Sequence, residues 1–200
     1  MPPALRRSDF LADRSLTGRA FCEAYTDLVD DWLRELFAET AGDRPGVALL
    51  AVGGQGRREL APQSDLDLLL LFDRGVDDIG EVANALWYPI WDIGLKLGHA
   101  VRTVRDTLTL AGEDLETATA LLTARHLAGD ESLSDELAEK AKAGWRRRGR
   151  KWLDELSGSV RERHAAAGEV AFDLEPDLKD GRGGLRDVHA LRWAEAAGAE

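Results

Sequence analysis

The sequence predicts an α/β (α+β) protein with a small mixed β-sheet core, an N-terminal helix before the core and a helical bundle after it. Three observations predict this fold class. Apolar residues recur at helical spacing up to about position 41. Two apolar runs of strand length, 47–52 and 65–72, then follow with a glycine-rich turn between them. Beyond position 108 the apolar spacing is helical again.

The first predicted segment, 1–45, is helical. Apolar residues within 15–41 recur at spacings of three and four, which gives one apolar stripe on a helix. Gly42 and Pro45 follow, and both residue types end helices. The stripe consists of Phe21, Tyr25, Leu28, Trp32 and Leu36.

The second predicted segment, 46–110, is a core of strands and one long helix. The runs 47–52 and 65–72 have the length and composition of buried strands. A helix is expected over 77–93, because apolar residues fall on one side of it. A third strand is expected over 95–103, where apolar residues alternate at period two.

The third predicted segment, 111–200, is a helical domain. Helices are expected over 108–128 and 132–166, and a last helix begins near Leu185. Between them, 168–184 is rich in Gly, Asp and Pro and predicts a polar loop. The sequence ends without a helix stop, so we expect the chain to be part of a longer protein.

Composition excludes several classes of function. A hydrophobic content of 44% and a charged content of 32% are typical of a globular chain. No apolar run reaches the roughly 20 residues that span a bilayer, and no signal peptide precedes the helices, so we expect a cytoplasmic protein without a membrane partner. The net charge of −11 argues against a nucleic-acid partner. The single cysteine, Cys22, excludes an internal disulfide and a cysteine-based zinc site.

Two carboxylates, Asp65 and Asp67, start the second predicted strand. Residues i and i+2 of a strand point to the same face, so these side chains should lie roughly 6 to 7 Å apart. Two anions at this separation repel each other unless a cation lies between them. Magnesium with nucleotide phosphates matches this pair, because it takes one or two carboxylates and fills its other positions with water and phosphate.

A glycine turn precedes the acidic pair. Gly53, Gly54 and Gly56 leave the backbone bare directly after a strand, so its amide groups can approach phosphate oxygens. Arg57 or Arg58 could reach the same phosphates. Each feature alone is common in proteins without this function. Their combination between two apolar strands favours phosphoryl or nucleotidyl transfer.

Four segments together resemble one family. The first two are Gly53-Gly54-Gln55-Gly56-Arg57-Arg58-Glu59-Leu60 and Ser64-Asp65-Leu66-Asp67-Leu68-Leu69. The third is Gly94-Leu95-Lys96-Leu97-Gly98-His99-Ala100-Val101-Arg102-Thr103. The fourth comprises Asp173-Leu174-Glu175-Pro176-Asp177-Leu178-Lys179 and Gly183-Gly184-Leu185-Arg186-Asp187-Val188-His189. The first two resemble the signature of DNA polymerase β-like nucleotidyltransferases, and all four resemble the protein-PII uridylyltransferase/uridylyl-removing enzymes.

The resemblance implies transfer of UMP from UTP to a tyrosine of the nitrogen-signalling protein PII, with Mg²⁺ or Mn²⁺. Some relatives transfer AMP from ATP, and the choice between the two bases stays open. Asp65 and Asp67 are then the catalytic residues and metal ligands. Lys179 and Arg186 could clamp phosphates, or could belong to a solvated loop between domains. The implied nucleotide-binding residues are Gly53, Gly54, Arg57, Ser64, Lys179 and Arg186.

The chain departs from this family in two ways. A third carboxylate is expected on strand 95–103, which contains none, and a compensating role of Asp92 or Asp173 stays open. No adjacent His-Asp dyad occurs, so hydrolytic uridylyl removal is not expected here. Two alternatives remain: a catalytically inert docking or regulatory domain, and adenylyl transfer to another acceptor.

Overall fold

The computed structural model describes residues 4–172 and 174–198. The chain forms two compact units. The first comprises the residues up to Leu110 together with Thr123–Ala138. The second comprises Ala111–Leu122 and the residues from Glu139 onward.

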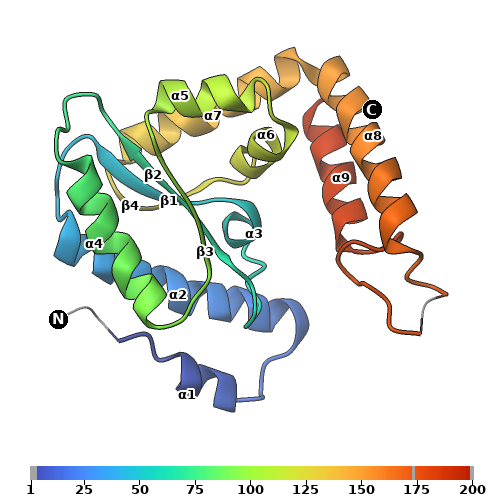
Figure 1. The fold of residues 1–200 in the computed structure, drawn as a ribbon, viewed down its shortest axis with the longest axis horizontal. Helices are drawn as coiled ribbons and strands as arrows, with labels where there is room; N and C mark the ends of the chain where they lie inside the picture. The colour runs from blue at the N-terminus through green and yellow to red at the C-terminus, as the bar shows by residue number, and fades with distance from the viewer. Residues whose placement is uncertain (1–3, 173, 199–200) are drawn as a thin grey trace. The chain divides into compact units, whose positions relative to one another are not determined.

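The described residues of the first unit form a four-stranded sheet and its covering helices (Figure 1). Its elements are α1 (Arg7–Ala12), α2 (Gly18–Thr40), β1 (Val47–Ala51), α3 (Gly53–Gly56), β2 (Leu66–Phe72), α4 (Ile79–Asp92), β3 (Leu97–Arg102), nearly all of α5 (Val104–Ala111), β4 (Arg125–Gly129) and the start of α7 (Glu131–Arg147). The second unit contains α6 (Leu115–Leu121), the end of α7, α8 (Gly149–Ala167) and α9 (Leu185–Ala196).

The sheet has the strand order β3-β2-β1-β4. β1 pairs with β2 and with β4 in antiparallel orientation, whereas β2 pairs with β3 in parallel orientation. The parallel pair requires a crossover connection, and α4 provides it. The sheet is therefore mixed, and the predicted fold class is confirmed.

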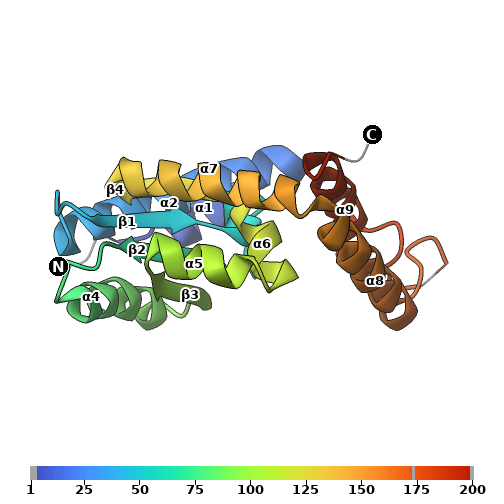
Figure 2. The ribbon, with the colours of Figure 1, turned by 90° about the horizontal axis from the view of Figure 1, so that it is seen from above.

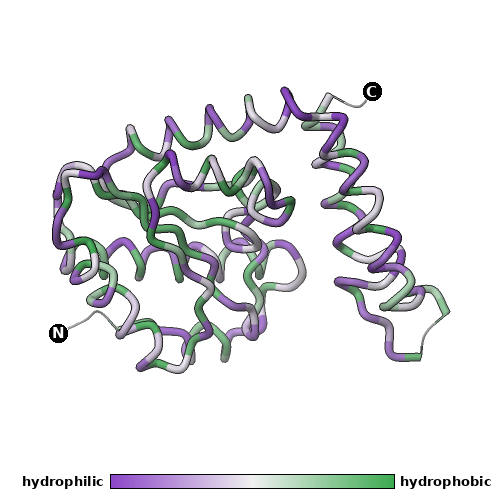
Figure 3. The backbone as a smooth tube through the Cα atoms, turned by 45° about the horizontal axis from the view of Figure 1, so that its top comes forward, coloured by the Kyte–Doolittle hydropathy of each residue, from purple (hydrophilic) through white to green (hydrophobic). Residues whose placement is uncertain are grey.

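The two faces of the sheet have different environments. Leu66, Leu68 and Leu70 of β2 belong to the core cluster that α2 and α4 share, with Leu86 and Ile90 among its buried members. Figure 1 shows α5 and the start of α7 on the opposite side of the strands from α2 and α4, and Figure 2 shows the strands between α7 and α4. Alternation along β2 directs Asp67 to the face opposite α2 and α4. Figure 3 shows that the central strands are largely apolar.

The long helix predicted over 108–128 is wrong. The structure divides this stretch into α5, α6 and the strand β4, which pairs with β1. The apolar residues of this stretch have helical spacing, but pairing with the exposed edge of β1 overrides this local preference. The single helix predicted over 132–166 is two helices in the structure. The helix is interrupted at Arg148 (φ −104°, ψ 17°), which separates α7 from α8.

The second unit is held together by tryptophans. Trp145 and Trp152 stack with their ring centroids 5.4 Å apart, and both are buried. The indole Nε1 of Trp145 donates a hydrogen bond to the carbonyl oxygen of Trp193 in α9 (3.0 Å). The predicted polar loop 168–184 and the helix after it are confirmed. Across the described part of the chain, no helix is long and apolar enough to cross a membrane.

Candidate active site

The glycine turn lies beside the second acidic residue because β1 and β2 are paired. Ala51 is the partner of Leu68, and one position further the amide of Val52 donates to the carbonyl oxygen of Asp67 (2.9 Å). The helical turn α3 therefore begins directly next to Asp67. Its first residue, Gly53, has φ +55°, a left-handed conformation that glycine adopts without steric cost.

The Asp67 carboxylate lies in a slot between two glycines. A Cβ on Gly53 would lie 2.5 Å from Asp67 Oδ2, and a Cβ on Gly98 of β3 would lie 3.0 Å from Oδ1. The amide of Gly54 also faces Oδ2, with its nitrogen at 3.3 Å. Only residues without a side chain leave room for the carboxylate on both sides. The sequence marked Gly53 as a phosphate contact, but gave Gly98 no role.

Asp65 directly precedes β2 and is more accessible than Asp67. Its side chain is 58% exposed, and its Oδ1 lies 3.9 Å from Nζ of Lys96. Among the described residues no group of three His, Cys, Asp or Glu side chains could hold a metal ion. A magnesium site at Asp65 and Asp67 stays a prediction, based on the chemistry of an ion that takes one or two carboxylates and completes its shell with water and phosphate oxygens.

The third carboxylate expected by resemblance is absent from the face of β3 that adjoins Asp67. The register pairs Asp67 with Gly98, so the side chains of Gly98, Ala100 and Arg102 share the face of Asp67. Asp92 is exposed at the end of α4, the helix that covers the other face, and this position does not support it as a third ligand. Asp173 lies outside the described residues.

Arg57 lies next to the glycine turn. Its Nη2 is 3.9 Å from the position of a Cβ on Gly54, and its Nε donates to Glu59 Oε2 (2.8 Å). The side chain is 17% exposed, so its charge is largely fixed in place. Arg58 instead pairs with Asp27 of α2 (2.6 Å). Of the two arginines, Arg57 is the one that the structure places beside the turn.

Ser64 closes the short turn before Asp65. Its hydroxyl oxygen accepts a hydrogen bond from the amide of Ala61 (3.0 Å), and its amide donates to the carbonyl oxygen of Ala61 (2.9 Å). In the structure Ser64 therefore shapes the connection that leads into Asp65. Its role in nucleotide binding stays a prediction.

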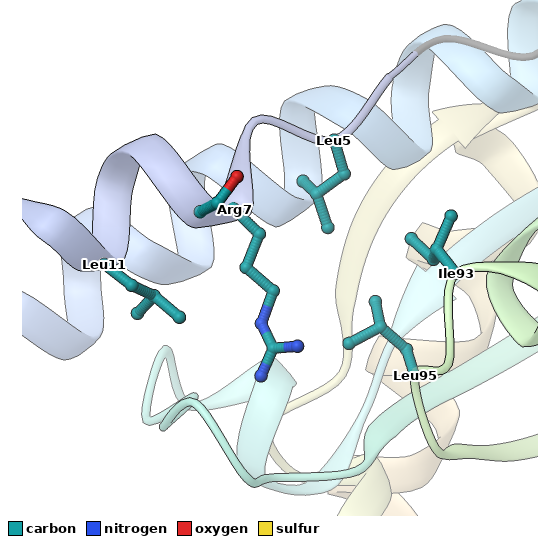
Figure 4. A pocket seen from close by; sticks show the side chains of 6 residues that line it. Leu5, Arg7, Leu11, Ile93 and Leu95 are labelled. Carbon is teal, nitrogen blue, oxygen red and sulfur yellow. The ribbon is translucent and has the colours of Figure 1, made fainter.

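The N-terminal segment also contacts this connection. Arg7 donates to the hydroxyl of Tyr25 (3.0 Å) and to the carbonyl oxygen of Pro62. Figure 4 shows the Arg7 side chain between leucines in a pocket of about 320 Å³. The pocket offers no carboxylate, so it does not match a metal–nucleotide site. It is lined by Leu5, Arg7, Ser8, Leu11, Ile93 and Leu95.

A buried polar network supports the glycine turn. Asp30 of α2 and Gln55 of α3 are both 0% exposed, and Gln55 Nε2 donates to Asp30 Oδ1 (3.0 Å). Arg125 of β4 lies 2.7 Å from Asp30 Oδ2 and donates to the carbonyl oxygen of Gln55 (3.1 Å). Burial raises the pKa of Asp30, while the hydrogen bond from Gln55 and the charge of Arg125 oppose this rise.

Sequence reasoning missed Asp30 and Arg125. The signal for Asp30 in the sequence is a charged residue at a core position of an amphipathic helix. No local pattern in the sequence indicates a role for Arg125. Its position near Asp30 depends on the strand β4, and the helical spacing of apolar residues in this stretch does not predict that strand.

The other two predicted nucleotide-binding residues, Lys179 and Arg186, lie in the second unit. Lys179 is exposed, and its amide donates to Asp177 Oδ1 (2.9 Å). Arg186 pairs with Asp180 through Nε (2.9 Å) and is 49% exposed. The structure thus brings together Gly53, Gly54, Arg57 and Asp67 in the first unit, and places Lys179 in the Gly/Asp-rich loop and Arg186 in the first turn of α9.

Asp187 anchors this loop to α8. Its Oδ1 accepts hydrogen bonds from Arg163 and from His164 Nε2 (2.8 Å), and its Oδ2 accepts one from the amide of Gly183 (2.7 Å). Partial burial acts to raise the pKa of Asp187, but these hydrogen bonds outweigh it and lower the pKa well below the usual range. The carboxylate therefore remains ionised and holds the loop against α8.

A mixed sheet with a glycine turn against a strand-borne carboxylate defines a nucleotidyltransferase-like α+β domain. Comparisons with known proteins give the particular family. Residues 150–197 match the family described as GlnD PII-uridylyltransferase. The chain is similar to this family over these residues.

Similar proteins carry the name bifunctional uridylyltransferase/uridylyl-removing enzyme. The Streptomyces coelicolor protein is 46% identical over 97% of this chain, which covers 23% of that protein. The Mycobacterium tuberculosis protein is 43% identical over 94% of this chain, and the matched region is 24% of that protein. The Rhodospirillum rubrum protein is 37% identical over 94% of this chain, and the matched region is 21% of that protein. The chain therefore spans about a quarter of the length of these relatives.

Proposed function

We propose that this chain carries out the nucleotidyl-transfer step of a PII uridylyltransferase. It transfers UMP from UTP to a tyrosine of PII with the help of Mg²⁺ or Mn²⁺. The tyrosine oxygen bonds to the α-phosphorus, the bond from this phosphorus to the pyrophosphate leaving group breaks, and the phenolic proton is released. The observation that carries the proposal is the Asp67 carboxylate in its slot against the bare backbone of Gly53 and Gly54.

The side chains at the site have distinct tasks in this proposal. Asp65 and Asp67 would hold the metal ion, which neutralises phosphate charge and polarises the reacting phosphate. The bare backbone of Gly53 and Gly54 lets the triphosphate approach closely. Arg57, held by Glu59, adds a positive charge beside the turn. These contributions are positioning and charge neutralisation, on which this class of reaction mainly depends.

The test is transfer of labelled UMP from UTP to PII by the chain, with and without Mg²⁺. We expect metal-dependent labelling of PII, and loss of labelling in Asp67→Asn. ATP, CTP and GTP run in parallel would reveal whether AMP is the transferred group. Labelling that is as fast with Asp67→Asn as with the unaltered chain would contradict the proposed site.

One observation favours a second candidate, an inert docking domain. No carboxylate on the described face of β3 completes a set of three with Asp65 and Asp67. If this candidate is correct, the chain binds PII but labels it with none of the four nucleotides. Binding measured by calorimetry together with the labelling assay separates the two candidates.

A further inference from the structure

The buried network beneath the glycine turn joins three segments that are far apart in the sequence. Asp30 comes from α2, Gln55 from α3 and Arg125 from β4. The guanidinium of Arg125 reaches the carbonyl oxygens of both Gln55 (3.1 Å) and Gly56 (3.4 Å). It thereby holds the end of the turn whose beginning, Gly53, contacts Asp67.

The network is costly for stability. The Asp30 side chain is 1% exposed and Arg125 is 26% exposed, and burying a carboxylate in an ion pair rarely stabilises more than apolar residues of similar volume would. Within the described part of the chain, Gln55 Oε1 is buried without a hydrogen-bond partner, which adds a desolvation cost. Ordinary core packing therefore does not explain why these polar groups lie here.

The last residue of the glycine turn, Gly56, is closely packed against neighbouring backbone. A Cβ on Gly56 would collide with the carbonyl oxygen of Thr123, which precedes β4. It would also lie 3.1 Å from the carbonyl oxygen of Ala51 in β1. The end of the turn is thus enclosed between β1 and the residue stretch that leads into β4, and Arg125 donates to two of its carbonyl oxygens.

We infer that Asp30, acting through Arg125 and Gln55, fixes the conformation of the glycine turn and thereby positions the triphosphate site. Asp30, Gln55 and Arg125 are positioning residues, because they act through the backbone of the turn. The effect on the triphosphate rests on the proposed function, whereas the effect on the turn does not.

Two variants and two matched controls test this inference. Asp30→Asn removes the buried charge with little change in shape, and Arg125→Lys keeps the charge but loses the planar fork that reaches several oxygens at once. The controls, Asp31→Asn and Arg19→Lys, alter exposed ion pairs on α2, in which Asp31 is 72% exposed and Arg19 is 86% exposed.

The first measurement is amide hydrogen exchange, which needs no nucleotide. We expect exchange at 53–57 to rise at least about tenfold in both variants, a change of about 1.4 kcal/mol in local opening. Exchange in α4 and in both controls should stay as in the unaltered chain. Unchanged exchange at 53–57 in folded variants would overturn the inference. So would a uniform rise throughout the first unit, since that indicates only lower overall stability.

The second measurement separates nucleotide binding from acceptor binding in transfer assays. We expect the KM for the metal–nucleotide to rise several-fold in Asp30→Asn and Arg125→Lys, with the KM for PII unchanged. Equal changes in both constants would contradict positioning of the triphosphate. If the unaltered chain transfers nothing, the proposed function fails, and the exchange measurement still decides whether Asp30 holds the turn.

A double variant keeps the test decisive if Asp30→Asn does not fold. Asp30→Asn combined with Arg125→Gln removes both charges, so neither is left buried without its partner. We expect this protein to melt near the temperature of the unaltered chain, yet to exchange faster at 53–57. A double variant whose turn is as protected as in the unaltered chain would overturn the inference.

Discussion

The amide nitrogen of Gly54 lies 3.3 Å from Oδ2 of Asp67, so the backbone of the glycine turn and the carboxylate of β2 are in direct contact. The turn and the acidic strand are separated in the sequence by the connection that Ser64 closes. Pairing of β1 with β2 brings the turn and the acidic strand together. This arrangement, and the anchoring of the Gly/Asp-rich loop by Asp187 in the second unit, lead to four predictions.

Replacing Asp67 with Asn should lower nucleotide transfer by at least about 10²-fold, the scale of losing one electrostatic stabiliser at a transition state. The fold should persist, because Asn is nearly isosteric and still fits the slot between Gly53 and Gly98. Transfer and thermal melting are measured on the same preparations. Asp92→Asn is the matched control, since Asp92 is on the helix at the opposite face, and it should transfer at the normal rate. An inactive Asp92→Asn that melts normally would identify Asp92 as the missing third ligand.

Replacing Gly98 with Ala should impair the site without replacing a charged residue. The new methyl group would lie 3.0 Å from Asp67 Oδ1, so the carboxylate must shift. We expect metal-dependent transfer to fall at least about tenfold, because small displacements of reacting groups are costly. Gly80→Ala in α4 is the control, since its Cβ meets nothing within 4 Å. Similar rates for both variants would show that the slot tolerates a side chain.

Triphosphate binding should require divalent metal, because Asp65 and Asp67 otherwise repel the phosphates. Asp65→Asn should weaken binding of UTP with Mg²⁺, and leave binding without metal unchanged or slightly stronger. Calorimetric titration of UTP and ATP, with Mg²⁺ and with a chelator, provides the comparison. Binding that is equally tight under all conditions, in both proteins, would locate the nucleotide elsewhere.

Replacing Asp187 with Asn should destabilise the second unit by about 2 kcal/mol at neutral pH, because hydrogen bonds to a charged group are lost. The folded-state pKa of Asp187 is lowered from the ordinary value of 3.8, so the ionised form stabilises the fold. This contribution is complete above pH values near 3.8, and is lost as the pH falls toward the lowered value. The difference between the two proteins should therefore shrink as the pH falls below about 3.8 toward the lowered pKa of Asp187.

Hydrogen exchange in α8 and α9 reports on this unit specifically. Glu195→Gln, which changes an exposed acid on α9, serves as the control and should have little effect. A difference between the unaltered chain and Asp187→Asn that grows toward acid pH would contradict the assignment of Asp187 as an ionised anchor.

Local patterns determined much of the fold and the centre of the site. The apolar stripe of α2, the apolar runs of β1 and β2, and the glycine turn all follow from interactions between near neighbours in the chain. Asp65 and Asp67 could be selected as candidate site residues for the same reason, because a carboxylate pair at the start of an apolar strand is conspicuous in the sequence, and their role stays a prediction. The relatives confirm the family that these segments indicated.

Only the tertiary structure decided which distant residues support that site. β4 was hidden because its segment has helical spacing, and its strand conformation comes from pairing with β1. Arg125 then reaches Asp30 and the turn, and Gly98 meets Asp67 through the parallel pairing of β3 with β2. These contacts depend on strand register and burial, which arise when the whole chain packs, and the spacing of residues along the sequence does not encode them locally.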